Sequence, residues 1–161
     1  MNARLQIMVD SREIEAAEAP DREVVARWRK AMGTYRDAAK DLGQDSKLTL
    51  YYQAGLQAAT TLIRGSGFRV LGTDHHRHTF EALRALDPGD LSAVARELNT
   101  FRRSRHQAVY DWDETAPNGA PDEADGLDAL TRSVDRLMQL SHAWLVVNRP
   151  GAADELEHPP A

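Results

Sequence analysis

The sequence predicts an all-α protein, an antiparallel bundle of four to five helices in one domain. Three observations support this. Apolar residues recur at spacings of three and four along several long segments, which is the period of an amphipathic helix. Alternating runs of β-branched residues are scarce. The chain has 161 residues and 42% of them are hydrophobic, which is enough for one domain with a sizeable core.

The helical period appears in five segments joined by short connections, as expected of an antiparallel bundle. The predicted helices cover about residues 21–42, 46–64, 74–86, 91–110 and 123–147. Gly43 is expected to end the first of them. Asp45 or Ser46 is expected to cap the second, and Asp90 the fourth. Three tryptophans near apolar stripes are expected to be core or interface anchors: Trp28, Trp112 and Trp144.

The segments outside this pattern set the domain boundaries. Residues 1–20 are ambiguous, because the apolar alternation in them is brief. Residues 113–122 contain two prolines and an Asn-Gly pair, which predict a loop. Residues 148–161 are rich in Pro, Ala and Glu and predict a flexible tail. The single domain is therefore expected to span residues 21–147.

Composition excludes several classes of protein. The chain has no cysteine, which excludes disulfide frameworks and cysteine-based zinc sites. Its apolar runs are too short to cross a bilayer, and residues 1–10 lack the pattern of a secretory signal. The sequence thus predicts a cytoplasmic protein without a membrane partner, and no cofactor is expected.

Charge is unevenly spread along the chain. The formal net charge is −5, so the chain as a whole would not attract nucleic acid. Residues 96–105, however, carry four arginines (Arg96, Arg102, Arg103 and Arg105) against the single Glu97. Residues 111–125 carry six acids and no base. A basic helix followed by an acidic loop is the main charge feature.

The basic helix carries the strongest candidate site. Arg102, His106 and Tyr110 are four residues apart and share one helix face, and Arg105 lies about 100° around the axis. Arginine matches phosphate oxygens with a planar fork of donors, histidine moves protons near neutral pH, and tyrosine donates a hydrogen bond or stacks on a base. Together these residues suit a phosphodiester ligand. Arg105 also interrupts an apolar stripe, which favours a functional interpretation.

Two simpler interpretations stand beside this one. The arginines would form a solvated helix end if they paired with Asp111, Asp113 or the acids of the last helix. A metal site could be suggested by three nearby histidines, His75, His76 and His78. Zinc, however, needs ligands that converge on it at about 2 Å, and the side chains of neighbouring residues at a helix start point in different directions. No metal is therefore expected, and His75 or His76 is expected to cap or pack at the helix start.

Three stretches, in order, resemble the HEPN superfamily of small helical bundles found in toxin–antitoxin and RNA-processing systems. The first is YYQAGLQAA at 51–59, an aromatic followed by small residues. The second comprises GFR at 67–69, GTDHH at 72–76 and TFEAL at 79–83. The third is RRSRHQAVYD at 102–111, which resembles the signature helix. The resemblance implies a HEPN-like core over about 46–147.

Active HEPN proteins are metal-independent endoribonucleases, and the resemblance implies roles for three residues. Arg105 stands at the signature arginine, which holds the scissile phosphate. His106 stands at the polar position that follows it. Tyr110 stands where the family has the histidine that helps to transfer the 2′-hydroxyl proton. A tyrosine with a pKa near 10 is a poor base at neutral pH, so the resemblance favours binding of RNA or a nucleotide over cleavage.

The resemblance also implies partners. HEPN-like proteins typically form homodimers in which two signature helices surround one cleft, so a homodimer about helix 91–110 is expected. Membership would suggest a toxin–antitoxin or defence component. The alternative is a non-enzymatic helical interaction module, for example the partner of a nucleotidyltransferase.

Overall fold

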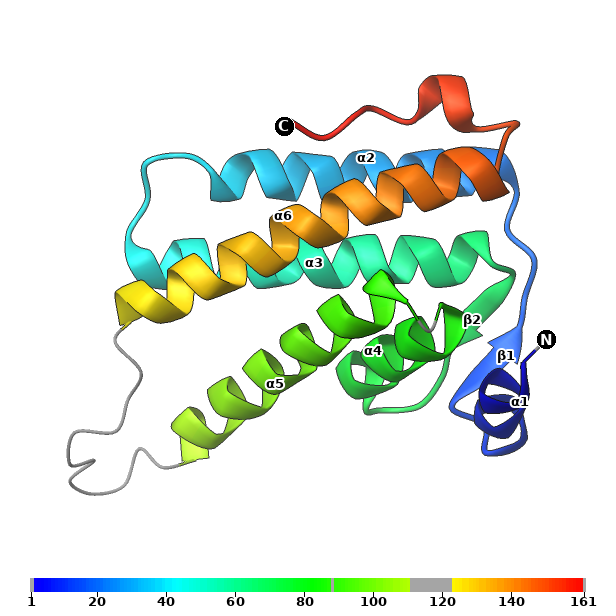
Figure 1. Cartoon of the computed structure of the whole chain (residues 1–161), viewed down its shortest axis with the longest axis horizontal. Helices are drawn as coiled ribbons and strands as arrows, with labels where there is room; N and C mark the ends of the chain where they lie inside the picture. The colour runs from blue at the N-terminus through cyan, green and yellow to red at the C-terminus, as the bar shows by residue number, and fades with distance from the viewer. Residues whose placement is uncertain (1, 88, 111–122, 161) are drawn as a thin grey trace.

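The computed structural model describes residues 2–87, 89–110 and 123–160, with the backbone alone for 106–110 and 123–125. The described chain is mostly helical with one small sheet, which confirms the all-α prediction (Figure 1). No described helix is both long and apolar enough to span a membrane. The elements in chain order are α1 (Ala3–Asp10), β1 (Ile14–Ala16), α2 (Asp21–Ala38), α3 (Gln44–Gly65), β2 (Phe68–Val70), α4 (His75–Leu86), α5 (Asp90–Tyr110), α6 (Glu123–Asn148) and the 3₁₀ helix η1 (Ala153–Glu155).

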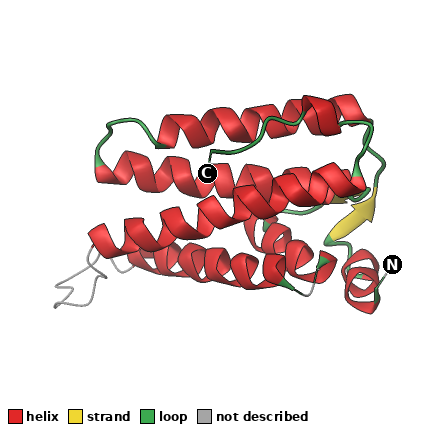
Figure 2. Ribbon diagram, turned by 45° about the horizontal axis from the view of Figure 1, so that its top comes forward, coloured by secondary structure: helices red, strands yellow, loops and turns green. Residues whose placement is uncertain are grey.

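Helix α3 lies at the centre of the bundle and packs against α2, α4 and α6. Figures 1 and 2 show α2 on one side of α3 and α4 and α5 on the other, and in Figure 1 helix α6 runs diagonally across α3. Gly55 lets the neighbours approach, because a Cβ atom there would lie 3.3 Å from Val134 Cγ2 and 3.5 Å from Leu98 Cδ1. The absence of a side chain at Gly55 thus sets how closely α5 and α6 pack on α3.

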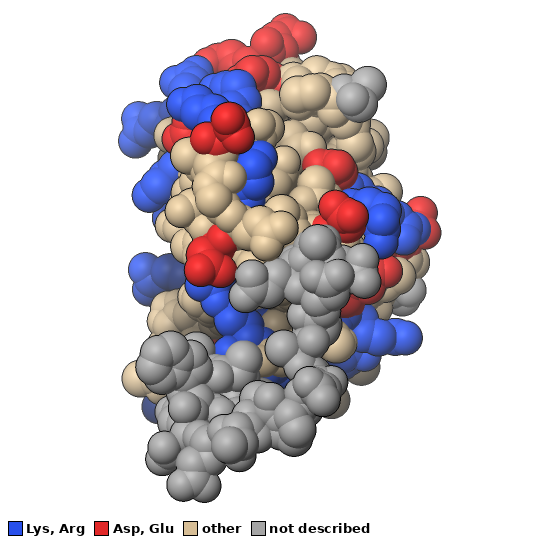
Figure 3. Space-filling view, turned by 90° about the vertical axis from the view of Figure 1, so that its left-hand side faces the viewer, with Lys and Arg blue, Asp and Glu red and all other residues tan. Residues whose placement is uncertain are grey.

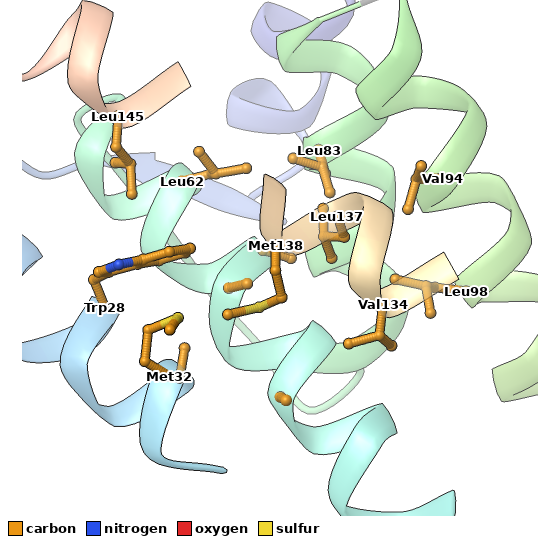
Figure 4. Packing of buried hydrophobic residues seen from close by; sticks show 14 of the residues in the cluster. Trp28, Met32, Leu62, Leu83, Val94, Leu98, Val134, Leu137, Met138 and Leu145 are labelled. Atoms are coloured by element: carbon orange, nitrogen blue, oxygen red, sulfur yellow. The ribbon is translucent and has the colours of Figure 1, made fainter. Parts of the chain in front are cut away.

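The main core is filled by large side chains from every long helix (Figure 4). Trp28 is 1% exposed, and its indole N–H donates a 2.8 Å hydrogen bond to the carbonyl of Glu157. A fully buried tryptophan needs a partner for this donor. The other labelled members of the core are Met32, Leu62, Leu83, Val94, Leu98, Val134, Leu137, Met138 and Leu145.

A smaller core lies under α1 and the two-stranded sheet. Strands β1 and β2 pair antiparallel, with Ile14 opposite Val70 and Ala16 opposite Phe68. Gly67, at φ +88°, provides the left-handed turn between α3 and β2 that other residues rarely adopt. The ambiguous N-terminal segment thus becomes a short helix and a strand, and the apolar positions of α1 that are buried, Leu5 and Met8, follow helical spacing.

Arg64 joins the small sheet to the bundle. Its side chain is nearly buried and donates from Nη1 to the carbonyls of Ala17 at 2.7 Å and Phe68 at 3.2 Å. Its Nε and Nη2 donate to the Glu23 carboxylate at 3.0 and 3.3 Å. Hydrogen bonds from Arg64 and then Arg27 hold the pKa of Glu23 below its usual value. One guanidinium therefore fixes the start of α2 and both strands against α3.

Several predicted helix ends differ from the structure. Helix α2 ends at Ala38 rather than at residue 42, and Leu42 is 38% exposed, so it takes no part in the buried stripe. Helix α3 begins at Gln44, with Gly43 at the cap position and no side-chain capping bond. Asp90 is the first residue of α5, where it pairs with Arg136 instead of capping. The predicted loop 113–122 and Trp112 lie outside the described residues.

The C-terminal segment, predicted to be a flexible tail, makes contacts with the bundle in the structure. Residues 149–160 lie along α2 and α6, with Leu156 only 5% exposed. His142 Nε2 lies 3.1 Å from the Leu156 carbonyl, and Gln139 donates to the carbonyl of Pro160 at 2.7 Å. Proline lacks the N–H that a helix needs but keeps a carbonyl acceptor. The prolines therefore limit regular helix in this segment to the short η1, while its carbonyls still attach it to α6.

The Arg64–Glu23 pair makes stability depend on pH. Glu23 has a lowered pKa in the folded state, so its ionised form stabilises the protein above about pH 4.3, the ordinary value for a glutamate, and this contribution is lost as the pH falls through the folded-state pKa. Glu23→Gln should lower the free energy of unfolding at pH 7 and flatten its decline from pH 5 to 3. Urea unfolding followed by circular dichroism measures both.

Arg64→Met tests the same ion pair by removing the guanidinium instead of the carboxylate. The variant should lose about 3–5 kcal/mol, because it removes two of the hydrogen bonds to the Glu23 carboxylate and leaves two carbonyls without their donor. Arg27→Gln is the matched control, since Arg27 contacts the same carboxylate from an exposed position and should contribute less than about 1 kcal/mol. Equal losses in the two variants would contradict this account.

Candidate functional site

A pocket of about 810 Å³ lies where α3, the start of α4 and α5 meet. Its size falls within the range of small-ligand sites, about 300–1,000 Å³. Ten residues line it: Thr49, Tyr52, Gln53, Leu56, Thr73, Asp74, His75, His76, Arg102 and Arg105. Two of the four predicted site residues, Arg102 and Arg105, are therefore brought to one pocket, together with histidines from a different helix.

Each arginine is held by a neutral partner. Arg102 is half-buried, and its Nε donates to Oδ1 of the buried Asn99 at 2.9 Å. Arg105 is exposed, and its Nη2 donates to Thr49 Oγ1 at 3.0 Å. Within the described residues neither guanidinium has a carboxylate within 4.0 Å. Both keep N–H groups that can donate hydrogen bonds to an anion in the pocket.

Tyr52 forms the aromatic wall of the pocket. Its ring is buried between those of Phe80, at 6.1 Å, and Phe101, at 5.8 Å. Burial raises the pKa of its hydroxyl to about 12, although the charges of Arg102 and Arg105 act in the opposite direction. The hydroxyl therefore keeps its proton at neutral pH and can donate it to a hydrogen bond.

His76 is the partner of that hydroxyl. Its Nδ1 lies 3.0 Å from the Tyr52 hydroxyl oxygen, and the two ring centroids are 5.7 Å apart. Burial lowers the pKa of His76, the charges of Arg102 and His75 lower it further, and Asp74 opposes them. The lowered pKa favours the neutral imidazole at pH 7, and its tautomer decides which member of the Tyr52–His76 pair donates the hydrogen bond.

Among the described residues that line the pocket, Asp74 is the only carboxylate, and it is already paired. Its Oδ2 lies 2.7 Å from Arg77 Nε, one helical turn further along α4. That pair offsets the acidic charge at the mouth of the pocket. The two arginines of α5 therefore dominate the local field, despite the net charge of −5 of the whole chain.

The three histidines of α4 do not converge on one point. His76 turns to Tyr52, whereas His78 is buried with Nδ1 3.2 Å from the carbonyl of Leu71 and Nε2 3.6 Å from Glu13. Across the described residues, no group of three or more potential ligands is arranged to hold a metal ion.

The rest of the predicted site extends beyond the described side chains. His106 and Tyr110 lie on the last turns of α5, but their side chains are outside the described residues, as are Asp111 and Asp113. The acids of α6 that are described make no ion pair with Arg102 or Arg105, which argues against that part of the solvated-end alternative. Arg103 is exposed and does not line the pocket.

Further arginines gather on another side of α4 and α5. Burial lowers the pKa of Arg84, and the charges of Arg4, Arg96 and Arg103 lower it further. The end of the bundle seen in Figure 3 has Lys and Arg mostly along its left edge, with Asp and Glu among them. Arg4 of α1 and Arg96 and Arg103 of α5 therefore lie close enough to Arg84 of α4 to act on its charge.

A second hollow of about 970 Å³ adjoins the pocket between α3, α5 and α6. Leu48, Phe101 and Leu130 contribute apolar surface to it, and charged side chains such as Glu97 and Arg136 line it as well. Thr49 and Arg105 belong to both cavities. A ligand that binds Arg105 from one cavity would therefore change the position of a side chain that also lines the other cavity.

Comparison of the chain with protein-family models, curated proteins and solved structures gave no match. The geometry of the pocket is therefore the basis for any statement about function.

Sequence reasoning missed the contributions of α3 and α4 to this site. Tyr52 lies four residues from Leu48 and from Leu56, a helical spacing that predicts a core position, and its ring is buried there. The feature of the sequence that could have pointed to a polar site is the Tyr52 hydroxyl, because a buried tyrosine needs a polar partner. That partner, His76, comes from a helix whose position relative to α3 the sequence did not reveal.

The electrostatic coupling in the pocket can be measured by NMR titration of His76. The pKa of His76 should lie below the ordinary value of about 6.5, and Arg102→Gln should raise it, because a nearby positive charge is removed. Arg103→Gln, on the same helix but outside the pocket, is the control and should leave it unchanged. His76→Gln assigns the signal among the six histidines. An unchanged pKa in Arg102→Gln would show that the two groups are not coupled.

Proposed function

We propose that this chain is a HEPN-like protein that binds RNA or a nucleotide, with Arg102 and Arg105 holding a phosphate in the pocket. The observation that carries the proposal is the meeting of these two guanidinium groups with the Tyr52–His76 pair in one hollow of about 810 Å³. A toxin–antitoxin or defence role in the cytoplasm would be consistent with that chemistry.

The pocket offers each element that a nucleotide needs. Two guanidinium groups supply several donors to phosphate oxygens, and their pairing with Thr49 and Asn99 fixes them in advance. Tyr52 and His76 add flat rings beside which a base or sugar can lie. His106 and Tyr110, further along α5, are assigned to the sugar or base by the resemblance.

RNA binding by variants of α5 tests the proposal. Wild-type protein should bind a short single-stranded RNA, and the affinity should fall steeply between 50 and 200 mM salt, because bound phosphates release counterions. Arg105→Ala should weaken binding by about tenfold or more, the loss expected for one charge-assisted contact of 1.5–3 kcal/mol. Fluorescence anisotropy at two salt concentrations measures both effects.

Arg103→Ala is the matched control, since Arg103 is exposed on the same helix and lies outside the pocket lining. It should weaken binding less than Arg105→Ala does. Absence of wild-type binding at low salt would refute the RNA proposal. Binding that is insensitive to Arg105→Ala would refute only the assignment of the site.

A homodimer about α5 is part of the same proposal. It would bring two copies of Arg102 and Arg105 into one groove, which would raise the local positive charge. Light scattering at tens of micromolar should then give about twice the chain mass of 17.9 kDa. A mass of 17.9 kDa under these conditions would contradict the dimer without affecting the pocket.

The second candidate function is a non-enzymatic interaction module, for example the partner of a nucleotidyltransferase. The observation that favours it is the hollow of about 970 Å³ between α3, α5 and α6, whose lining combines apolar side chains such as Leu48 and Phe101 with charges of both signs, a mixture that suits a protein surface. This candidate becomes the preferred function if the wild-type protein shows no affinity for RNA.

A further inference from the structure

We propose that the face formed by α2 and α6 is a binding site for an extended, proline-containing segment of a partner protein. Residues 152–160 of the chain are its intramolecular occupant (Figure 1). The side chains that bind this segment do not line the pocket with Arg102 and Arg105, so the inference is independent of the proposed function. Its basis is the set of hydrogen bonds between helix side chains and the backbone of the segment.

The site recognises the backbone of the segment through its carbonyls. Trp28 Nε1 on α2 donates at 2.8 Å to the carbonyl of Glu157, and Gln139 Nε2 on α6 donates at 2.7 Å to that of Pro160. His142 Nε2 lies 3.1 Å from a third carbonyl, one residue before the first. Every residue type carries this acceptor, so the three donors fit an extended backbone of many sequences. Aromatic side chains beside an extended segment with prolines are typical of peptide-recognition grooves.

Three side chains of the segment determine which sequence fits best. Leu156 is 5% exposed and belongs to the main core, and Pro159 is buried three residues later. Glu157 forms an ion pair with Arg36 of α2. The other side chains from 154 to 160 are exposed and restrict the sequence little. The site therefore selects a leucine followed three residues later by a proline, and it favours an acid directly after the leucine.

The segment is held more weakly than the helices it covers. Its regular structure ends with η1 at Glu155. Among the described residues, no backbone N–H from 157 onward donates to another backbone group. A segment attached by a few side-chain bonds opens locally at a lower free energy than a core helix does. It can therefore detach and leave the site to another chain while the bundle stays folded.

The start of the segment is fixed on its own bundle, which favours a partner protein over exchange with a second copy. Arg149 donates to the Ala19 carbonyl at 2.6 Å and to Asp21 at 2.8 Å. Gly151 lies so close to Asp21 that a Cβ atom there would overlap its carboxylate. Residues 152–160 extend beyond this anchor, and a chain of that length reaches at most about 30 Å. The detached segment therefore stays near its site and competes with a partner at an effective concentration in the millimolar range.

The test measures binding of a fluorescein-labelled peptide, AADELEHPP, which has the sequence of residues 152–160, by fluorescence anisotropy. The full-length double variant Leu156→Ser, Pro159→Ser loses both buried side chains of its own segment, so its site should bind the peptide. The wild type should bind at least about tenfold more weakly, because its own segment competes. A peptide with serine in place of the leucine and the first proline should bind neither protein.

Two further changes connect this binding to the proposed site. Gln139→Ala, added to the double variant, should weaken peptide binding about two- to tenfold, the loss expected for one neutral hydrogen bond. Asp154→Ser, Glu155→Ser is the matched control, because both side chains are exposed, and it should bind as weakly as the wild type does. If circular dichroism shows that the double variant is unfolded, Glu157→Arg replaces it. This change repels Arg36 from an exposed position, so it should leave the core intact and strengthen peptide binding relative to the wild type.

Three outcomes would overturn the inference. One is a folded variant with a weakened segment that does not bind the peptide. Another is equal binding by this variant and the wild type, because the segment would then not occupy the site of the peptide. The third is a wild-type dimer that the variant loses in light scattering, which would assign the site to the C-terminal segment of a second copy.

Discussion

The close approach of other helices to α3 is the constraint on which the rest of the structure depends. A helix can be covered on several sides only if small residues allow its neighbours near, and α3 carries Ala54, Gly55, Ala58 and Ala59 in its buried part. The exposed side chains of α3 all lie in its first turns, among them Thr49 and Gln53. The pocket opens at those turns, so the packing of the core determines where a ligand can enter.

Where the chain is irregular, guanidinium groups supply the hydrogen bonds to backbone carbonyls that a helix or sheet would otherwise supply. Arg64 donates to carbonyls on either side of the small sheet, and Arg149 donates to the Ala19 carbonyl at 2.6 Å and to Asp21. Irregular backbone leaves carbonyls without ladder partners, and a fixed fork of donors can satisfy several at once. The same residue type thus serves structure at one end of α3 and faces a pocket at the other.

Most of the fold could be predicted from local periodicity, because the helices are long and amphipathic. The strands at 14–16 and 68–70 could not, since three residues give no period to detect, and their pairing joins segments more than 50 residues apart. Arg102 and Arg105 stood out because they are charges beside an apolar stripe. The pairing of Tyr52 with His76 did not stand out, because it depends on how α3 and α4 pack and not on either sequence pattern alone.

The docked C-terminal segment has a consequence for observing the protein in solution. The indole proton of Trp28 is bonded to the Glu157 carbonyl, and its side chain is almost fully covered. That proton can exchange with solvent only when the segment detaches or the bundle opens. Trp28 is therefore a built-in probe of the last dozen residues, since one slowly exchanging indole signal distinguishes the docked form from one in which this segment has come away.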